Sequence, residues 1–207
     1  MSLLTLDKKG VITALILGLL IYYVGGIIPI LFMLFLLILS AHVTYLGYYE
    51  KKTMHVYEYE RSWKNVISNG LIPLIALLLP TYRVIGFLSA LSAVLADKFS
   101  SEIGVFGGKP IELFSFKSVK PGKSGAVTSL GFFAAFVGAI IISLLGIFFY
   151  KINVIDSFII IIAGFLGSLF DSIAGYFEER GIGNKSTSNL FGSLVGMLVA
   201  ILLKVFL

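Results

Sequence analysis

The sequence predicts an all-α fold, a polytopic membrane helical bundle of about seven transmembrane helices that forms a single integral membrane domain over residues 1–207. The chain is 58% hydrophobic and only 13% charged, and its mean hydropathy is +1.01. Soluble domains are about 45–50% apolar and about 25% charged. This composition excludes a soluble globular protein, a disordered chain and a nucleic-acid-binding module, so we expect no nucleic-acid partner.

Seven apolar runs support this fold, because a helix needs about 17–25 mostly apolar residues to cross the hydrocarbon of a bilayer. Glycines, prolines or polar residues separate the runs, which cover about 11–24, 27–49, 63–79, 83–100, 125–150, 154–177 and 188–207. The first run is short, and only Gly25 and Gly26 separate it from the second. These two runs therefore form either two full spans or a re-entrant pair.

Lysine and arginine are distributed unevenly between the two sides of the seven predicted spans. Of the 16 such residues, all but Arg83, Lys151 and Lys204 fall on the side of the N-terminus. Cytoplasmic loops carry an excess of these residues. We therefore expect a cytoplasmic N-terminus and an active cytoplasmic face, formed by the longer polar connections at about 50–62, 101–124 and 178–187.

The candidate functional groups are carboxylates, amides and lysines, because the chain has no cysteine and only two histidines. An ionisable side chain at the centre of a span costs about 2.5–3.5 kcal/mol on insertion scales, so it is a functional candidate by default. Asp171 is the clearest case, because it shares a helix face with Gly164, Gly167 and Gly175. Small residues on that face let helices approach closely. The structural alternative is a buried aspartate paired with a lysine.

Asp97 and Glu102 lie where the fourth run ends, next to Ser101. On a straight helix a spacing of five residues separates two side chains by about 140°, so these carboxylates meet only if the chain turns between them. Carboxylate oxygens are typical Mg²⁺ ligands. We expect Asp97, Glu102 and Asp171 to bind Mg²⁺, with ordinary solvation of a helix end as the alternative for the first two.

Two further groups of polar residues have the composition of a phosphate-binding site. Asn65, Asn69 and Asn189 lie at the starts of two runs, where amides bind a ligand or hold helices together. Glycines permit close backbone approach, and the N-terminus of a following helix attracts anions. Attraction of lysines to anionic lipid is the alternative, which explains the charge but not the glycines. The residues of this loop are Lys109, Lys117, Lys120, Gly122, Lys123, Ser124 and Gly125.

The sequence resembles the transmembrane protein 19 family of integral membrane proteins. The resemblance rests on residues 96–104 (ADKFSSEIG), on Lys109-Pro110, and on residues 119–131 (VKPGKSGAVTSLG). Asn65-Val66, Asn69-Gly70, Asp171-Ser172 and Asn189-Leu190 also match in the order of the family. This chain departs from the family at Lys98, where threonine is usual, at Lys123, where threonine or serine is usual, and at Ser186, where aspartate is frequent.

The plant chloroplast member of this family is a phytyl-phosphate kinase, and a weaker similarity extends to CTP-dependent polyprenol kinases. The resemblance therefore implies a membrane kinase that moves the γ-phosphoryl group of a nucleoside triphosphate, with CTP favoured, to an isoprenyl monophosphate such as phytyl, geranylgeranyl or polyprenyl phosphate. Its catalytic residues would be Asp97, Glu102, Asp171 and Lys123. The substrate and nucleotide would contact Asn65, Asn69, Ser101, Lys109, Lys117, Lys120, Gly122, Ser124, Gly125 and Asn189.

We expect the isoprenoid tail to enter from the bilayer along the small-residue helix faces. Two other classes of function remain open at this point. One is a transporter of an ion, a small organic anion or a lipid phosphate, and the other is a non-catalytic lipid-binding scaffold. The sequence also leaves both a monomer and a homodimer open.

Overall fold

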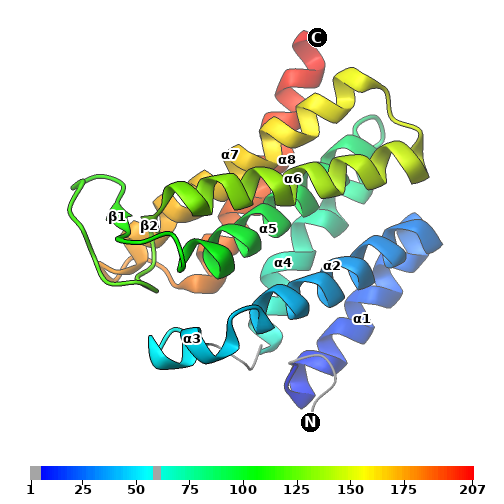
Figure 1. Ribbon diagram of the computed structural model, residues 1–207. Coiled ribbons are helices and arrows are strands. Elements are labelled where there is room, and N and C mark those ends of the chain that lie inside the picture. The colour runs from blue at the N-terminus through cyan, green and yellow to red at the C-terminus, as the bar shows by residue number, and fades with distance from the viewer. Residues whose placement is uncertain (1–5, 58–61) are drawn as a thin grey trace.

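The structure, a computed structural model, describes residues 6–57 and 62–207 as a helical bundle with one very small sheet (Figure 1). Along the described part of the chain its elements are α1 (Lys8–Gly25), α2 (Ile27–Tyr45), α3 (Tyr48–Thr53), α4 (Trp63–Leu77), α5 (Arg83–Gly104), β1 (Ile111–Glu112), β2 (Ala126–Val127), α6 (Ser129–Tyr150), α7 (Val154–Glu178) and α8 (Lys185–Phe206). The strands pair antiparallel, with Ile111 opposite Val127. The predicted all-α membrane bundle is confirmed.

Six helices of the described chain are long and apolar enough to cross a membrane, namely α1, α2, α5, α6, α7 and α8. The third predicted span is the exception, because α4 has 15 residues. At a rise of 1.5 Å per residue it is about 22 Å long, which is shorter than the hydrocarbon core of about 30 Å. Both α1 and α2 have the length of full spans.

The longer polar connections gather at one end of the bundle. In Figure 1, α3 and the β1–β2 sheet lie at the end opposite the C-terminus, and α8 begins there. We call this the polar end. The short links from α1 to α2, from α4 to α5 and from α6 to α7 lie at the other end, where the Arg83 guanidinium donates to the Val24 carbonyl at 2.9 Å. The assignment of the polar end to the cytoplasm remains a prediction.

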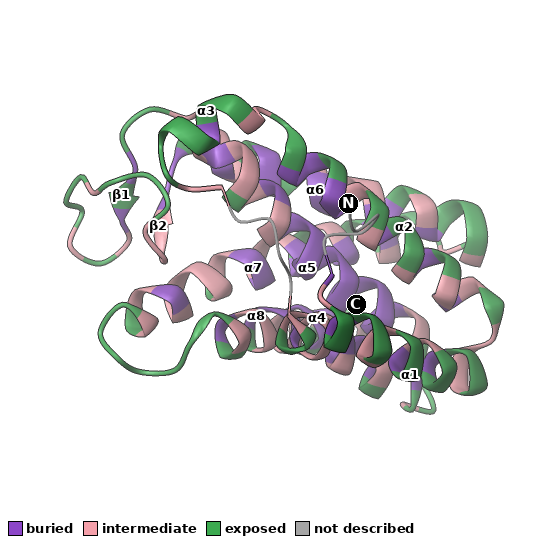
Figure 2. Cartoon of the chain, turned by 90° about the horizontal axis from the view of Figure 1, so that it is seen from below, coloured by how far each residue is buried: buried purple, intermediate pink, exposed green. Residues whose placement is uncertain are grey.

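Helix α5 is the centre of the fold. Leu88, Leu91 and Leu95 on this helix are completely buried, and Figure 2 shows buried residues along α5 and exposed ones on the outer faces of the surrounding helices. Those outer faces are apolar, for example at Leu19 (69% exposed) and Phe133 (67% exposed). Contiguous apolar surface of this kind needs a non-aqueous neighbour, which a lipid bilayer supplies.

Small residues set the spacing of α5, α7 and α8, as predicted. A Cβ atom on Gly167 would lie 2.7 Å from the Gly192 carbonyl oxygen, and one on Gly196 would lie 3.0 Å from the Ser89 carbonyl oxygen. The three backbones are therefore in direct contact. This packing contradicts the expected route for the isoprenoid tail, because the small-residue faces are filled by neighbouring helices.

We predict that Gly167→Val lowers stability by about 1–3 kcal/mol or more, because its side chain would be forced against the backbone of α8. SDS-induced unfolding followed by circular dichroism measures the effect. Gly18→Ala is the matched control, since the nearest atom to a Cβ there is Ile30 Cδ1 at 4.0 Å. Equal stability of the two variants would contradict the close packing of α7 on α8.

Candidate active site

A cavity of about 500 Å³ opens at the polar end, between α1 and α2 on one side and α4, α5, α7 and α8 on the other. Most of the predicted site residues line this single cavity. They are Asn65, Asn69, Asp97, Ser101, Glu102, Gly122, Lys123, Ser124, Gly125, Asp171 and Asn189. The remaining three, Lys109, Lys117 and Lys120, are exposed and are not among its lining residues.

Asp97, Asp171, Asn69 and Asn189 come together because they lie at similar distances from the polar end of the bundle. Asp97 lies seven residues before the end of α5, and Asp171 lies seven residues before the end of α7. A rise of 1.5 Å per residue places both about 10 Å below the polar end. Asn69 and Asn189 follow the starts of α4 and α8 by six and four residues, so the amides reach about the same level from neighbouring helices.

The carboxyl groups of Asp97 and Asp171 face each other, close enough for a side-chain hydrogen bond. The charges of Lys98 and Lys185 act on Asp97. In one orientation of its side-chain amide, Asn189 donates to Asn69 Oδ1 at 3.4 Å. With the amide group rotated by 180°, its nitrogen donates instead to Asp171 Oδ2 at 3.3 Å. Carboxylates and amides from four helices thus converge at one wall of the cavity.

Glu102 does not join this pair. A turn between Asp97 and Glu102 would bring them together, but α5 continues as a regular helix to Gly104, so the two side chains point to different sides. Within the described residues, no group of three Asp, Glu or His side chains converges to hold a metal ion. Of the three carboxylates predicted to bind Mg²⁺, the structure therefore brings Asp97 and Asp171 together and places Glu102 elsewhere. Mg²⁺ binding itself stays a prediction.

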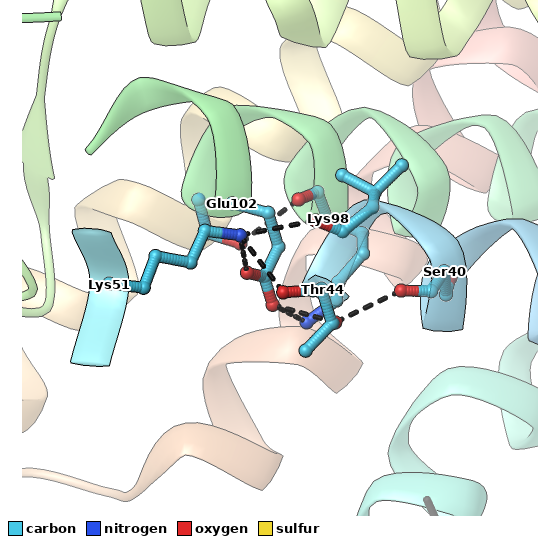
Figure 3. A network of polar contacts seen from close by, with 7 residues as sticks. Ser40, Thr44, Lys51, Lys98 and Glu102 are labelled. Carbon is cyan, nitrogen blue, oxygen red and sulfur yellow. Dashed lines mark hydrogen bonds and ion pairs between the residues drawn. The ribbon is translucent and has the colours of Figure 1, made fainter. Parts of the chain in front are cut away.

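Glu102 instead forms ion pairs with two lysines (Figure 3). Lys51 Nζ lies 2.6 Å from its Oε2, and Lys98 is paired with its Oε1. The Thr44 hydroxyl also donates to Oε1, at 2.9 Å. Lys51 is only 1% exposed and also donates to the carbonyls of Val43 and Thr44 at the end of α2. This network ties α2 and α3 to α5.

Lys123 comes from the glycine-containing turn before α6. Its Nζ lies 3.1 Å from Glu112 Oε1, and Arg180 Nη2 lies 3.3 Å from the same atom. The predicted position of this turn at a helix N-terminus is wrong. Strand β2 and Thr128 separate the turn from α6, and the Thr128 hydroxyl already accepts from the Gly131 amide at 3.0 Å.

The glycines of this turn fit it against α7. Gly125 has a φ of +75°, and a Cβ on it would lie 2.8 Å from the Ser172 carbonyl oxygen. The adjacent Ser124 amide donates to Glu179 Oε1 at 3.1 Å. The turn is therefore held on the last turns of α7, with Lys123 and the two glycines at the cavity wall.

The integral membrane protein DUF92 family matches this chain over residues 1–203. The chain belongs to that family. It is 35% identical over 207 residues to the uncharacterised membrane protein MJ0933 of Methanocaldococcus jannaschii, covering 96% of this chain and 85% of that protein. It is 25% identical over 220 residues to the chloroplastic protein VTE6 of Arabidopsis thaliana, covering 98% of this chain and 66% of that protein. No solved structure matches the chain.

Membership of the DUF92 family confirms the resemblance read from the segments around Asp97 and Gly122. The structure adds cavity residues that the sequence analysis did not select: Lys51, Lys98, Ser172, Glu178, Lys185 and Ser188. Two of them were detectable by helical spacing. Glu178 lies seven residues after Asp171, and Lys185 lies four residues before Asn189, so each shares a face with a predicted residue.

We predict that Lys51→Met destabilises the protein by about 3–5 kcal/mol, because it breaks a buried ion pair and removes the donor to the Val43 and Thr44 carbonyls. The measurement is SDS-induced unfolding of the purified protein. Lys52→Met is the control, because Lys52 is exposed and surface charges contribute about 0–1 kcal/mol. Similar losses in both variants would show that the buried position of Lys51 is unimportant.

We predict a pH dependence from Glu112. The Ser115 hydroxyl, Lys123 and Arg180 lower the pKa of Glu112 from 4.5 to about 2. A depressed folded-state pKa contributes stability that is complete above about pH 4.5 and is lost as the pH falls towards 2. The gap in thermal midpoint between wild type and Glu112→Gln should therefore shrink as the pH falls from 6 to 2. Glu50→Gln, at an exposed glutamate of α3, is the control, and a constant gap for Glu112→Gln would refute the prediction.

Proposed function

We propose that this protein is a membrane-embedded kinase that transfers the γ-phosphoryl group of a nucleoside triphosphate, with CTP favoured, to an isoprenyl monophosphate. One observation carries the proposal: a single cavity has facing carboxylates, amides and lysines at one end and apolar walls at the other. The family resemblance implies the same activity, and the similarity to a chloroplast protein over almost the whole chain supports it.

The division of the cavity matches the division of a lipid phosphate. Its polar wall holds Asp97, Asp171 and Lys185, whereas α1 and α2 supply apolar side chains such as Leu17 and Met33. A prenyl monophosphate has the same two parts, an anionic head and a hydrocarbon tail. Ligand sites of this volume typically combine apolar walls with a few convergent polar groups.

The residues at the polar wall fit Mg²⁺. Mg²⁺ prefers oxygen ligands and is usually bound by one or two carboxylates together with substrate phosphates. Asp97 and Asp171 would hold the ion, with amide oxygens of Asn69 or Asn189 beside them. When bound there, Mg²⁺ would neutralise charge on the nucleotide phosphates.

The reaction requires little proton transfer. An oxygen of the prenyl phosphate bonds to the γ-phosphorus, while the bond from that phosphorus to the β–γ bridging oxygen breaks and the nucleoside diphosphate leaves. The acceptor phosphate has a second pKa near ~6, so it is mostly dianionic at neutral pH and needs no general base. Catalysis then depends on positioning and on charge neutralisation, for which Lys98, Lys123 and Lys185 line the cavity.

We predict that Asp97→Asn and Asp171→Asn each reduce diphosphate formation by at least about 100-fold, the usual effect of removing a group that stabilises transition-state charge. Both variants should keep the wild-type helical content, and EDTA should stop wild-type turnover. Asp156→Asn is the matched control, because Asp156 pairs with Lys204 at 2.7 Å at the opposite end of the bundle. A fully active Asp171→Asn would exclude that residue as a ligand.

A thermal-shift series with CTP, ATP, GTP and UTP, with and without Mg²⁺, tests the proposal before any acceptor is known. A ligand that binds only the folded protein raises its midpoint, so we expect a Mg²⁺-dependent increase that is largest with CTP. Folded protein that responds to no nucleotide, but moves anions across liposome membranes, would favour the transporter instead.

A further inference from the structure

The apolar part of the cavity extends away from the carboxylates between α1 and α2. We call this extension the apolar arm. It is continuous with the polar wall, because the residues of both parts line one cavity. Its lining residues are Ala14, Leu17, Gly18 and Ile21 on α1, and Ile30, Met33, Leu34 and Leu37 on α2.

The arm has a definite length. On α2 the lining residues run from Ser40, nearest the polar end, to Ile30, and ten residues of helix span about 15 Å. An isoprene unit adds four bonds of about 1.5 Å to a chain, or about 5 Å when extended. The arm therefore holds about three isoprene units, and a further unit next to the phosphate would lie beside the polar wall.

Gly18 and Ile30 narrow the far part of the arm. They nearly close it, since a Cβ on Gly18 would already be in van der Waals contact with Ile30 Cδ1, at 4.0 Å. A side chain larger than alanine at position 18 would enter the space that the glycine leaves open. Beyond them Ile21 is completely buried, so the arm ends against the core of the bundle.

The arm also borders the surface that faces lipid. In Figure 1, α1 and α2 separate from their common link towards the polar end. Leu34 lines the cavity, whereas Leu31 and Ile38, one turn of α2 on either side of it, are 44% and 48% exposed without lining the cavity. Leu34 therefore lies where the arm meets the outer apolar surface of α2. A lipid tail can thus enter the arm sideways from the bilayer.

We propose that the apolar arm binds the tail of the lipid substrate, which enters between α1 and α2, and that Gly18 and Ile30 limit this tail to about four isoprene units. The inference rests on the proposed kinase function. It places the tail between α1 and α2, apart from the filled small-residue faces of α7 and α8, and it assigns a specificity role to two residues far from the carboxylates.

The test is a series of prenyl monophosphates with two, three, four and more isoprene units, assayed for diphosphate formation at a fixed nucleotide concentration. Gly18→Leu should lower kcat/KM for the four-unit acceptor by about tenfold or more, the usual effect of a few methylene groups in an apolar pocket, and leave the two-unit acceptor nearly unchanged. Ile30→Ala should raise the relative rate with acceptors longer than four units. Leu19→Phe is the control, because Leu19 is 69% exposed and is not a lining residue.

A second readout separates this inference from the proposed function. Thermal stabilisation by the same prenyl monophosphates, without nucleotide, reports tail binding alone. If wild type forms no diphosphate but its stabilisation depends on tail length, and Gly18→Leu shifts that dependence, the kinase proposal fails and the arm is supported. If Gly18→Leu and Leu19→Phe both keep the wild-type length profile in turnover and in stabilisation, the arm is overturned.

Discussion

Direct backbone contact between α5, α7 and α8 is the constraint on which the site depends. A Cβ atom on Gly192 would lie 2.8 Å from both the Gly167 carbonyl oxygen and Asp171 Cβ. Only helices with small residues at their crossing approach this closely. The contact brings Asp171 to the same level as Asp97 and Asn189, although these residues come from three different helices.

The opposite wall of the cavity is held by a different kind of interaction. Helices α1 and α2 have mostly exposed apolar surfaces, so packing alone fixes them weakly. The buried pair of Lys51 and Glu102 anchors the end of α2 to α5, beside the carboxylates. A buried ion pair contributes little net stability but determines geometry strongly, because leaving either charge unpaired is costly. The cavity thus has one wall set by steric contact and another set by charge.

Composition and periodicity were sufficient to predict the membrane bundle, because apolar runs of spanning length are rare outside membrane proteins. They also selected Asp171 as an ionisable group inside a span and Asp97 as a carboxylate at the end of one, but they did not predict that these two residues face each other. They did not predict the role of Glu102, which depended on whether α5 ends at Ser100 or continues to Gly104. Its lysine partner on α3 is 51 residues away, so no local pattern could have identified it.

Lys98, Lys123 and Ser186, the three positions where this chain departs from the transmembrane protein 19 pattern, lie in or near the polar wall of the cavity and differ in their contacts. Lys98 and Lys123 stand where the family usually has a hydroxyl residue. Both lysines line the cavity, and they are paired with Glu102 and Glu112. In this chain each of these two cations is therefore held in place by a glutamate. Ser186 stands where the family often has aspartate, but it is not a lining residue, and its amide is capped by Asn184. That departure therefore removes no carboxylate from the wall formed by Asp97 and Asp171. A chemistry that depends on those two residues does not require an acid at position 186.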